Sequence, residues 1–249
     1  MYRFQARWAE QWRVGRCMIA GDAAHLMPPF AGEGMCAGFR DAVALGWRLN
    51  AIIEGKLSDA VLDTYVSERI HHAKHYIDFS QELGKIICIA DPQEAQARDK
   101  KMKAELAARN HEPITGDLVT LGVGVWCEGT PAAGELSTQG VVEFNGKRDR
   151  FDQSVGQGWI VVGLNSDPAE ALNTRQLELL HSLDGRTVSV GSEPDCDAID
   201  IDGTYADWLA SIDAQYFVLR PDFYVAATAG SASELGVRLD EVFGKLGVV

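Results

Sequence analysis

The chain has 249 residues, of which 46% are hydrophobic and 24% charged, and its formal net charge is −13. This composition is typical of a folded globular protein, and the length allows two domains of ordinary size. The acidic balance argues against nucleic acid or an anionic membrane as a partner, because both require a basic protein surface.

The cysteines and the N-terminal residues bear on the cellular compartment. No CxxC pair and no metal-ligand spacing occurs among the five cysteines, Cys17, Cys36, Cys88, Cys127 and Cys196. Cys17 and Cys36 have no activating neighbour in sequence, so we expect small core residues rather than reactive thiols. The stretch MYRFQARWAEQW lacks the apolar core of a signal peptide, and no apolar run approaches the roughly 18 residues of a membrane helix. We therefore expect a cytoplasmic protein.

The first part of the chain predicts a strand, a sharp turn and a helix. Arg16–Ala20 is a short apolar run that ends at Gly21–Asp22, as expected for a buried strand entering a turn. Gly34 then precedes a sequence with apolar positions at Phe39, Val43, Leu45, Trp47, Leu49 and Ile52, which favours a largely buried helix. Gly55 marks its expected end.

Two further helices follow, and then the composition of the sequence changes. The apolar repeat after Ser58 predicts a helix to about Ile89, and the sequence from Pro92 predicts an exposed helix or connector, since it contains few large apolar residues. From about Glu112 the sequence is irregular and rich in glycine, and we place a domain boundary there. The later elements are a strand at 158–164, a helix at 174–183, a strand at 187–190, a short helix at 205–212, strands at 216–220 and 224–229, and a helix at 233–246.

This order predicts an α/β protein in which residues 158–249 form a small layer with a mixed sheet. Residues 1–110 form a first domain, and residues 111–157 are linker and edge segments between the two. No internal repeat is evident.

The segment from Gly21 to Arg40 carries the groups that a bound cofactor needs. The Asp22 carboxylate can accept hydrogen bonds from sugar-like hydroxyls, and Gly21 allows a ligand to approach the backbone. Pro28–Pro29 can wall one side of a planar ring. Gly34 begins a helix whose free amides and positive dipole end suit an anion or an electron-rich carbonyl, such as the N1/C2 edge of a flavin.

The pattern GRxxxAGDAAHxxPPxxGxGM resembles the second FAD signature of class A flavoprotein aromatic hydroxylases. The stretch MPPFAGEGMCAGFRDA is similar to 3-(3-hydroxyphenyl)propionate hydroxylase-like and phenol hydroxylase-like enzymes, which also carry a thioredoxin-like C-terminal domain. The segment from Gly158, including RPDFYVA at 220–226, resembles that domain. It contains no CxxC, which excludes disulfide exchange and leaves a structural or oligomer-forming role, or a cover over the active-site mouth.

The resemblance implies an assignment of roles to individual residues. Asp22 would bind the ribityl or pyrophosphate end of FAD, Pro29 would lie by the reactive flavin edge, and the amides of Gly34, Met35 and Cys36 would face the pyrimidine edge. Gly21 and Gly32 complete the expected cofactor-binding set. Glu33 stands where Gln or Lys is more frequent, which would alter the electrostatics of the flavin edge modestly.

The activity that the resemblance implies is hydroxylation of a phenolic small molecule, with FAD as cofactor and NAD(P)H as co-substrate. Such enzymes begin with a strand, GxGxxG and helix that hold the ADP part of FAD, and nothing before Gly15 supplies them. We therefore expect the C-terminal part of a hydroxylase, inactive alone. The alternatives are a stand-alone, non-redox thioredoxin-like binding or assembly module, and a related flavin oxidoreductase of polyketide or isoprenoid metabolism.

Three other patterns resemble a metal site, a catalytic base and a calcium loop, and each has a plainer interpretation. His71, His72 and His75 with Glu68 could hold a metal on one helix face, but we expect solvated side chains and no metal. His25 is expected to pack and hydrogen-bond within the turn rather than act as a base. The run EPDCDAIDIDGTYADW fails as a calcium loop, because Ala198 and Leu209 fall on ligand positions. Asp202 or Thr204 is expected to cap the next helix.

Overall fold

The computed structural model describes residues 4–110 and 119–248. It divides into two compact units, Met1–Ala42 with Ile70–Val119 and Val43–Arg69 with Thr120–Val249. The helices α1 (Gly34–Ile53) and α2 (Val61–Ile87) contribute to both units. The boundary expected near Glu112 lies outside the described residues.

The first unit combines small strand pairs with helical segments. β1 (Arg7–Trp8) pairs with β4 (His25–Leu26), and β2 (Arg13–Val14) pairs with β3 (Cys17–Met18), all antiparallel. Two 3₁₀ turns, η1 (Gly21–Ala23) and η2 (Pro29–Ala31), lead into α1.

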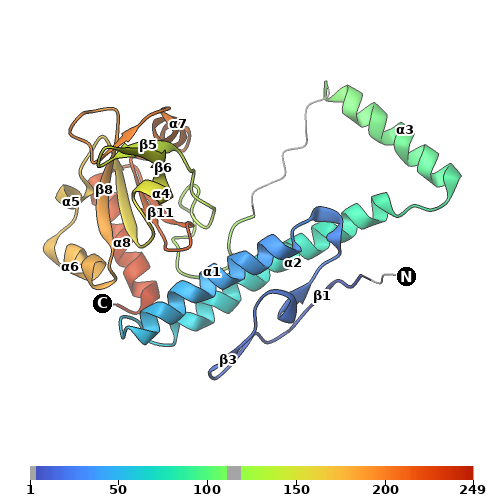
Figure 1. Ribbon diagram of the computed structural model, residues 1–249, viewed down its shortest axis with the longest axis horizontal. Coiled ribbons are helices and arrows are strands. Elements are labelled where there is room, and N and C mark those ends of the chain that lie inside the picture. The colour runs from blue at the N-terminus through green and yellow to red at the C-terminus, as the bar shows by residue number, and fades with distance from the viewer. Residues whose placement is uncertain (1–3, 111–118, 249) are drawn as a thin grey trace. The chain divides into compact units, whose positions relative to one another are not determined.

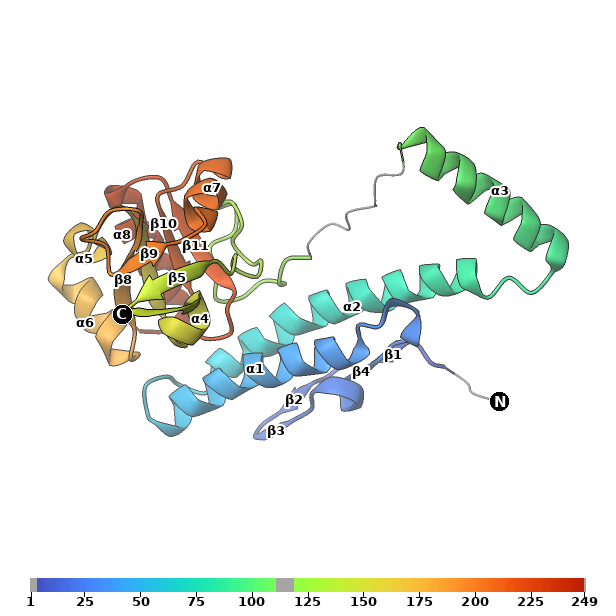
Figure 2. The same ribbon diagram turned by 45° about the horizontal axis from the view of Figure 1, so that its top comes forward.

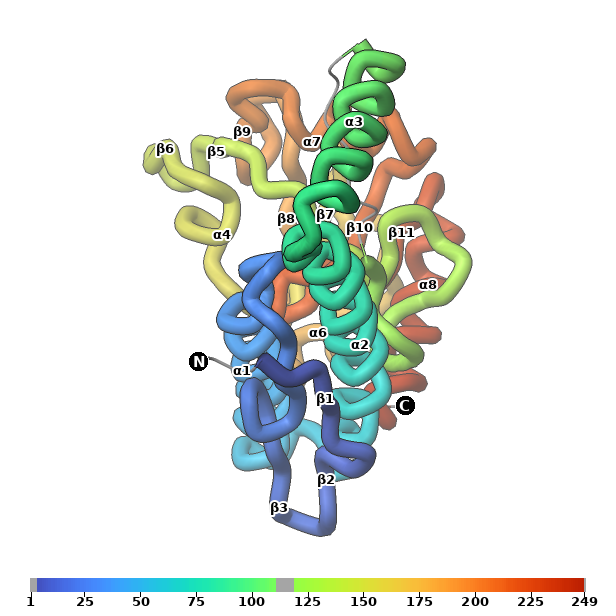
Figure 3. The backbone as a smooth tube through the Cα atoms, turned by 90° about the vertical axis from the view of Figure 1, so that its right-hand side faces the viewer, coloured from blue at the N-terminus to red at the C-terminus, as the bar shows by residue number. Residues whose placement is uncertain are grey.

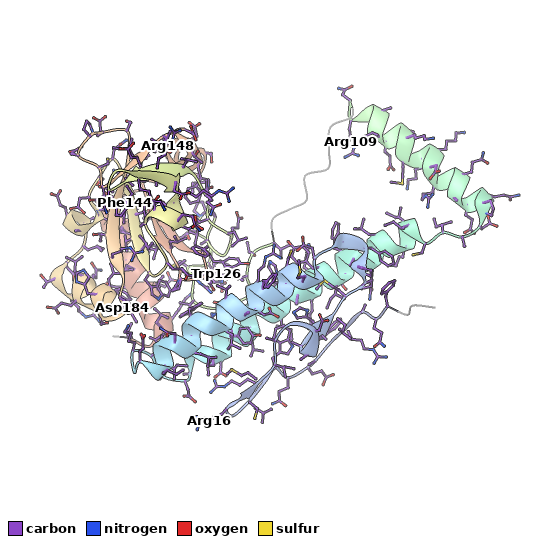
Figure 4. All side chains as sticks on the ribbon, in the orientation of Figure 1. Arg16, Arg109, Trp126, Phe144, Arg148 and Asp184 are labelled. Carbon is purple, nitrogen blue, oxygen red and sulfur yellow. The ribbon has the colours of Figure 1, made fainter. Side chains whose placement is uncertain are left out.

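The buried strand expected at Arg16–Ala20 is wrong. β3 has only two residues, and β2 is its one partner among the described residues, so its faces are not covered by a larger sheet. Arg16 lies in the turn of this hairpin, which Figure 3 shows in blue and Figure 4 marks with the Arg16 label. Cys17 is consequently exposed, so the expectation of a core residue is wrong for Cys17, whereas Cys36 is half-buried.

The helix predicted from Gly34 is confirmed, but its buried face differs from the expected one. The apolar side chains of Phe39 and Val43 are exposed. The buried positions recur at helical spacing and carry small or charged residues, namely Ala37, Asp41, Ala44 and Arg48. A pattern of apolar residues alone could not find this face, because two of its members are buried through ion pairs.

The second and third helices agree with the sequence. α2 begins three residues after Ser58, whose carbonyl accepts the Val61 amide. α3 (Pro92–Ala108) is capped by the Asp91 carboxylate, which accepts from the amides of Gln93 and Glu94, and it has no buried residue. The expectation of an exposed helix or connector is confirmed. No helix in the described part of the chain is long and apolar enough to cross a membrane.

The second unit is built on a mixed sheet (Figure 1). Its strands are β5 (Val141–Phe144), β6 (Lys147–Arg150), β7 (Ile160–Leu164), β8 (Arg186–Gly191), β9 (Ala198–Asp200), β10 (Tyr216–Leu219) and β11 (Val225–Ala229). Their order is β11-β10-β7-β8-β9-β5-β6, with β7, β8 and β9 parallel and the other pairs antiparallel.

Helices cover both faces of this sheet, as Figure 2 shows. They are α4 (Phe151–Ser154), α5 (Pro168–Ala171), α6 (Thr174–Ser182), α7 (Thr204–Ser211) and α8 (Ala232–Leu246). Alternate strand residues point to opposite faces, so Val161 and Val218 enter one core with α6 and α8, while Val162 and Phe217 enter the other with α7. Residues of α1 and α2 join the first core, which contains Trp47, Ala51, Ile52, Leu57 and Val61.

The elements predicted after residue 158 agree with the structure to within two residues at each end. The βαβ unit from β7 to β8, followed by the β10–β11 pair and α8, confirms the thioredoxin-like arrangement. The sequence did not predict β5, β6, β9, α4 or α5, which are short.

The predicted cap of the short helix α7 is wrong. Neither Asp202 nor Thr204 holds that position, since Gly203, at φ +70°, is the N-cap residue. The Asp200 carboxylate instead accepts from the amides of Thr204, Tyr205 and Ala206 at 2.8–3.2 Å. A capping carboxylate can come from the preceding strand because the αL glycine folds the chain back toward it.

Candidate functional site

The Gly-Asp turn lies directly on helix α1. Gly21 has φ +57°, a left-handed conformation that favours glycine, and its carbonyl accepts the Ala24 amide at 2.8 Å. A Cβ on Gly21 would lie 3.7 Å from the Cα of Gly38, so the two glycine backbones pass close to each other. The Asp22 side chain is exposed at the outer side of the turn.

A buried carboxylate on α1 fixes the conformation of this turn. Asp41 Oδ2 accepts the Gly21 amide at 2.9 Å and lies 2.7 Å from His25 Nε2. Both Asp41 and His25 are buried, and the His25 ring packs against Trp12. The expectation that His25 packs and hydrogen-bonds within the turn is confirmed. The sequence did not identify Asp41 as its partner, although the GFRDA stretch places an acidic residue on the correct helix.

The loop with the two prolines is held by helix α2. The Ser80 hydroxyl donates to the Pro28 carbonyl. A Cβ on Gly84 would lie 2.6 Å from the ring of Phe30, so this ring occupies space that only glycine leaves free. Pro29 is exposed and opens η2, which Gly32 closes at φ +68°. The loop therefore presents a rigid proline edge outward.

The start of α1 provides free amide donors. The Ala37 amide donates to the Glu33 carbonyl at 2.8 Å, so Gly34, Met35 and Cys36 precede the first i→i−4 bond of the helix. Their N–H groups and the helix dipole favour negative charge in front of this end. The Glu33 carboxylate, which would oppose this, is paired with Arg40 Nη1 at 3.0 Å.

These residues fit one wall of an FAD site. Gly21, Asp22, Pro29, Gly32, Gly34, Met35 and Cys36 all belong to the first unit. They combine an exposed carboxylate for sugar hydroxyls, an exposed proline and a helix end for an electron-rich carbonyl. The fixed glycine turns give a flat ring close access to the backbone.

The histidines of α2 differ in exposure. His71 and His75 are exposed as expected, but His72 is buried, so the expectation that it is solvated is wrong. No group of three His, Cys, Asp or Glu residues suited to a metal occurs in residues 4–110 and 119–248. The Glu68 side chain contacts Arg48 and Arg220 and belongs to a cluster of charged residues in the second unit.

This charge cluster was missed by the sequence reasoning. Glu68 accepts from Arg48 Nη2 at 2.7 Å and from both terminal nitrogens of Arg220 at 2.9 and 2.8 Å. Asp222 accepts from Arg220 at 2.9 and 2.7 Å and from Trp47 Nε1 at 3.0 Å. Arg220 and Asp222 open the RPDFYVA stretch and lie between β10 and β11, as the two strands predicted at 216–220 and 224–229 imply.

The charges of this cluster shift the pKa values of its carboxyl groups. Burial alone would raise the pKa of Glu68, but the opposing charges of Arg220 and Arg48 outweigh it and hold this pKa below its ordinary value. Burial also favours a higher pKa for Asp222, but the opposing charge of Arg220 outweighs it, so the pKa of Asp222 is lowered as well. The cluster contains two cations and two anions, so it is neutral as a whole.

Two family models match the chain. Residues 1–80 match an FAD binding domain, and residues 134–245 match the HcaD C-terminal domain. The Gly-Asp turn and the start of α1 lie within the first match, and the sheet of the second unit lies within the second.

Curated relatives are aromatic hydroxylases. The chain is 32% identical over 237 residues to a probable NADH-specific resorcinol 4-hydroxylase of Rhodococcus jostii strain RHA1, covering 94% of this chain and 44% of that protein. It is 31% identical over 253 residues to the 3-(3-hydroxy-phenyl)propionate/3-hydroxycinnamic acid hydroxylase of Escherichia coli O157:H7, covering 92% of this chain and 45% of that protein. The chain thus spans less than half the length of these relatives.

Solved structures with the same fold are flavoproteins. The flavin-dependent monooxygenase PieE, in complex with FAD and substrate, matches with a TM-score of 0.75 and 18% identity, over all of this chain and 50% of that chain. Aklavinone-11 hydroxylase, in a ternary complex with FAD and aklavinone, matches with a TM-score of 0.69 and 21% identity, over 98% of this chain and 46% of that chain. At this identity the likeness establishes the fold.

Proposed function

Because the chain is homologous to class A FAD-dependent aromatic hydroxylases, we propose that it supplies the carboxyl-terminal part of a monooxygenase that hydroxylates a phenolic compound, with FAD as cofactor and NAD(P)H as co-substrate. The observation that carries this proposal is the Gly-Asp turn, fixed by Asp41 against the start of α1. A turn built only for stability would not need an exposed carboxylate, an exposed proline edge and a free helix end together.

The proposed contacts with FAD follow from the chemistry of each group. Asp22 lies at the ribityl or pyrophosphate end of the cofactor, where its carboxylate accepts hydrogen bonds from ribityl hydroxyls, and Gly21 lets this end approach the backbone. Pro29 and Gly32 wall the ring. The amides of Gly34, Met35 and Cys36 face the pyrimidine edge, where the helix end stabilises the negative charge of the reduced flavin. FAD supplies the redox chemistry.

We further propose the division of the chain and its setting. Residues 1–110 form the FAD-domain part, residues 111–157 connect, and residues 158–249 form the thioredoxin-like domain, whose role is structural or oligomer-forming. The scattered, unpaired cysteines support a cytoplasmic setting.

A complementation experiment tests the proposed function. The chain is co-expressed with the part of the Rhodococcus jostii relative that it does not match, and FAD binding is followed by the change in flavin absorbance. We expect an altered flavin spectrum and NADH oxidation that depends on a phenolic compound. Either half alone should show neither.

Two variants make this test specific for the site. Asp22→Asn should weaken FAD binding about tenfold or more, because a charge-assisted hydrogen bond is replaced by a neutral one. Asp78→Asn, at an exposed position of α2 in the same unit, should bind like the wild type. Complementation that gives no flavin-bound complex, or an Asp22→Asn variant with unchanged affinity, would support the alternative of a stand-alone binding or assembly module.

A further inference from the structure

A cavity of about 450 Å³ lies within the second unit, beside the second half of α1. Its apolar wall comes from α1, the residue before β7, the end of α6 and the turn between β10 and β11, through Val43, Trp47, Ala51, Trp159, Leu183 and Pro221. Small-molecule sites in proteins are concave, mostly apolar and about 300–1,000 Å³ in volume, so this cavity has the size of one.

Two tryptophans form the aromatic part of this wall. The rings of Trp47 and Trp159 meet edge to face, with centroids 5.7 Å apart and an interplanar angle of 88°. Trp159 is buried to 3% exposure, and Trp47 is half-buried. The accessible part of Trp47 therefore gives a planar guest a surface on which to pack, and the Trp159 ring lines the cavity beside it.

The Trp47 ring is fixed before any guest arrives. Its Nε1 donates to the buried Asp222 carboxylate at 3.0 Å, and the Arg48 guanidinium lies over its face at 4.3 Å from the centroid. Asp222 is itself held by Arg220. Binding would not require this side chain to be ordered, which lowers the entropic cost of association.

The polar residues of the cavity carry a net negative charge. Glu54 and Asp184 contribute two carboxylates, and Asp184 is labelled in Figure 4. Lys56 contributes one ammonium that contacts both of them, at 2.6 Å from Glu54. Hydrogen bonds with Asp184 and Glu54 raise the pKa of Lys56, so it stays charged at neutral pH. The side-chain amides of Asn50 and Gln157 provide neutral donors and acceptors.

We propose that this cavity binds a small, neutral phenol. The aromatic ring packs against Trp47 and Trp159, and the hydroxyl donates to a carboxylate or an amide oxygen at the rim. A carboxylated aromatic is disfavoured, because two rim carboxylates face one ammonium and a third anion would meet net repulsion. The inference rests on residues of the second unit and does not depend on the proposed function.

The test uses a matched pair of ligands on the 249-residue chain. Isothermal titration calorimetry with 4-methylphenol should give saturable binding of one molecule per chain. 4-hydroxybenzoate, a similar ring with a charged carboxylate, should bind at least about tenfold more weakly. Glu54→Gln should narrow this difference, because it removes one rim anion.

A variant that fills the cavity with a larger side chain shows whether the phenol binds there. Gly46 lines the cavity on α1, and a Cβ there meets no atom within 4 Å, so we expect Gly46→Leu to extend its side chain into the cavity. Gly244→Leu is the matched control, since Gly244 lies in α8, also has open space at its Cβ and does not line the cavity. Both variants should fold, because leucine favours a helix over glycine.

We expect Gly46→Leu to abolish 4-methylphenol binding and Gly244→Leu to leave it unchanged, with urea midpoints of both variants at or above the wild-type value. The proposal is overturned if 4-methylphenol gives no saturable heat, if Gly46→Leu binds it like the wild type, or if 4-hydroxybenzoate binds as tightly. These outcomes involve no flavin and no turnover, so they are independent of the complementation experiment.

Discussion

Arg220 and Glu68, 152 residues apart in sequence, form a two-point ion pair in which neither side chain is exposed. The pair joins α2 to the turn between β10 and β11, and Arg48 adds α1 to the same carboxylate. The Glu68 side chain also accepts the Val125 amide at 2.7 Å, so the segment before β5 is tied to it as well. Four separate stretches of the second unit thus meet at one carboxylate.

Removal of this carboxylate charge should be strongly destabilising. Glu68→Gln leaves Arg48 and Arg220 buried with only Asp222 as an anion, and an uncompensated buried charge costs about 3–5 kcal/mol. Urea unfolding, followed by circular dichroism, measures the change. Arg175→Met is the control, since the Arg175–Asp240 pair is 3.5 Å long and half exposed and should cost at most about 1 kcal/mol. Equal losses for the two variants would contradict a special role of the cluster.

The cluster should also make the second unit sensitive to acid. The pKa values of Glu68 and Asp222 are lowered in the folded state, so each carboxylate stabilises the fold fully above its unfolded pKa of about 4. This contribution is lost as the pH falls from there through the lower, folded pKa values, because the unfolded chain then binds more protons. Urea midpoints measured from pH 7 to pH 3 should fall for the wild type and fall less steeply for Glu68→Gln. Parallel curves would count against this assignment.

The Gly-Asp turn should depend on Asp41. Asp41→Asn removes the charge that holds the Gly21 amide and His25, and a hydrogen bond to a charged group contributes about 1.5–3 kcal/mol. We expect the Gly21 amide to exchange with solvent at least about tenfold faster, as measured by hydrogen–deuterium exchange. Asp78→Asn, an exposed position in the same unit, should leave the exchange of this amide unchanged. Unchanged protection in Asp41→Asn would show that the turn is held by its backbone alone.

The sequence predicted those parts of the fold that depend on local patterns. The strands β7, β8, β10 and β11 are rich in apolar residues and lie between turn residues, and α8 begins after a capping serine, Ser231, so their positions follow from short stretches of sequence. The resemblance of the Gly-Asp segment to a known signature supplied the proposed flavin-facing residues, and His25 was correctly interpreted as a packing residue.

The parts that were missed depend on distant partners. Arg48 and Glu68 look like solvated positions of their helices. Arg48 is buried against Glu68, and the second cation that Glu68 contacts, Arg220, lies far along the chain. Position 124 must also be glycine for a reason that lies far away in sequence, because a Cβ there would lie 2.1 Å from Glu68 Oε1. For Cys17 the apolar run suggested a core strand, but burial requires covering layers that a five-residue pattern does not specify.

The cysteines should differ sharply in reactivity, according to burial. Cys127 is fully buried, and burial followed by the nearby charge of Glu241 raises its pKa to about 12, so almost no thiolate exists at neutral pH. Cys17 and Cys88 are exposed. Titration of the native chain with a disulfide reagent at pH 8 should therefore label Cys17 and Cys88 first and leave Cys127 unlabelled until urea is added. A Cys17→Ser/Cys88→Ser variant should lose the fast phase, while Cys127→Ser should keep it. Fast labelling of Cys127, identified by peptide mass mapping, would show that the core around β11 and α8 opens readily in solution.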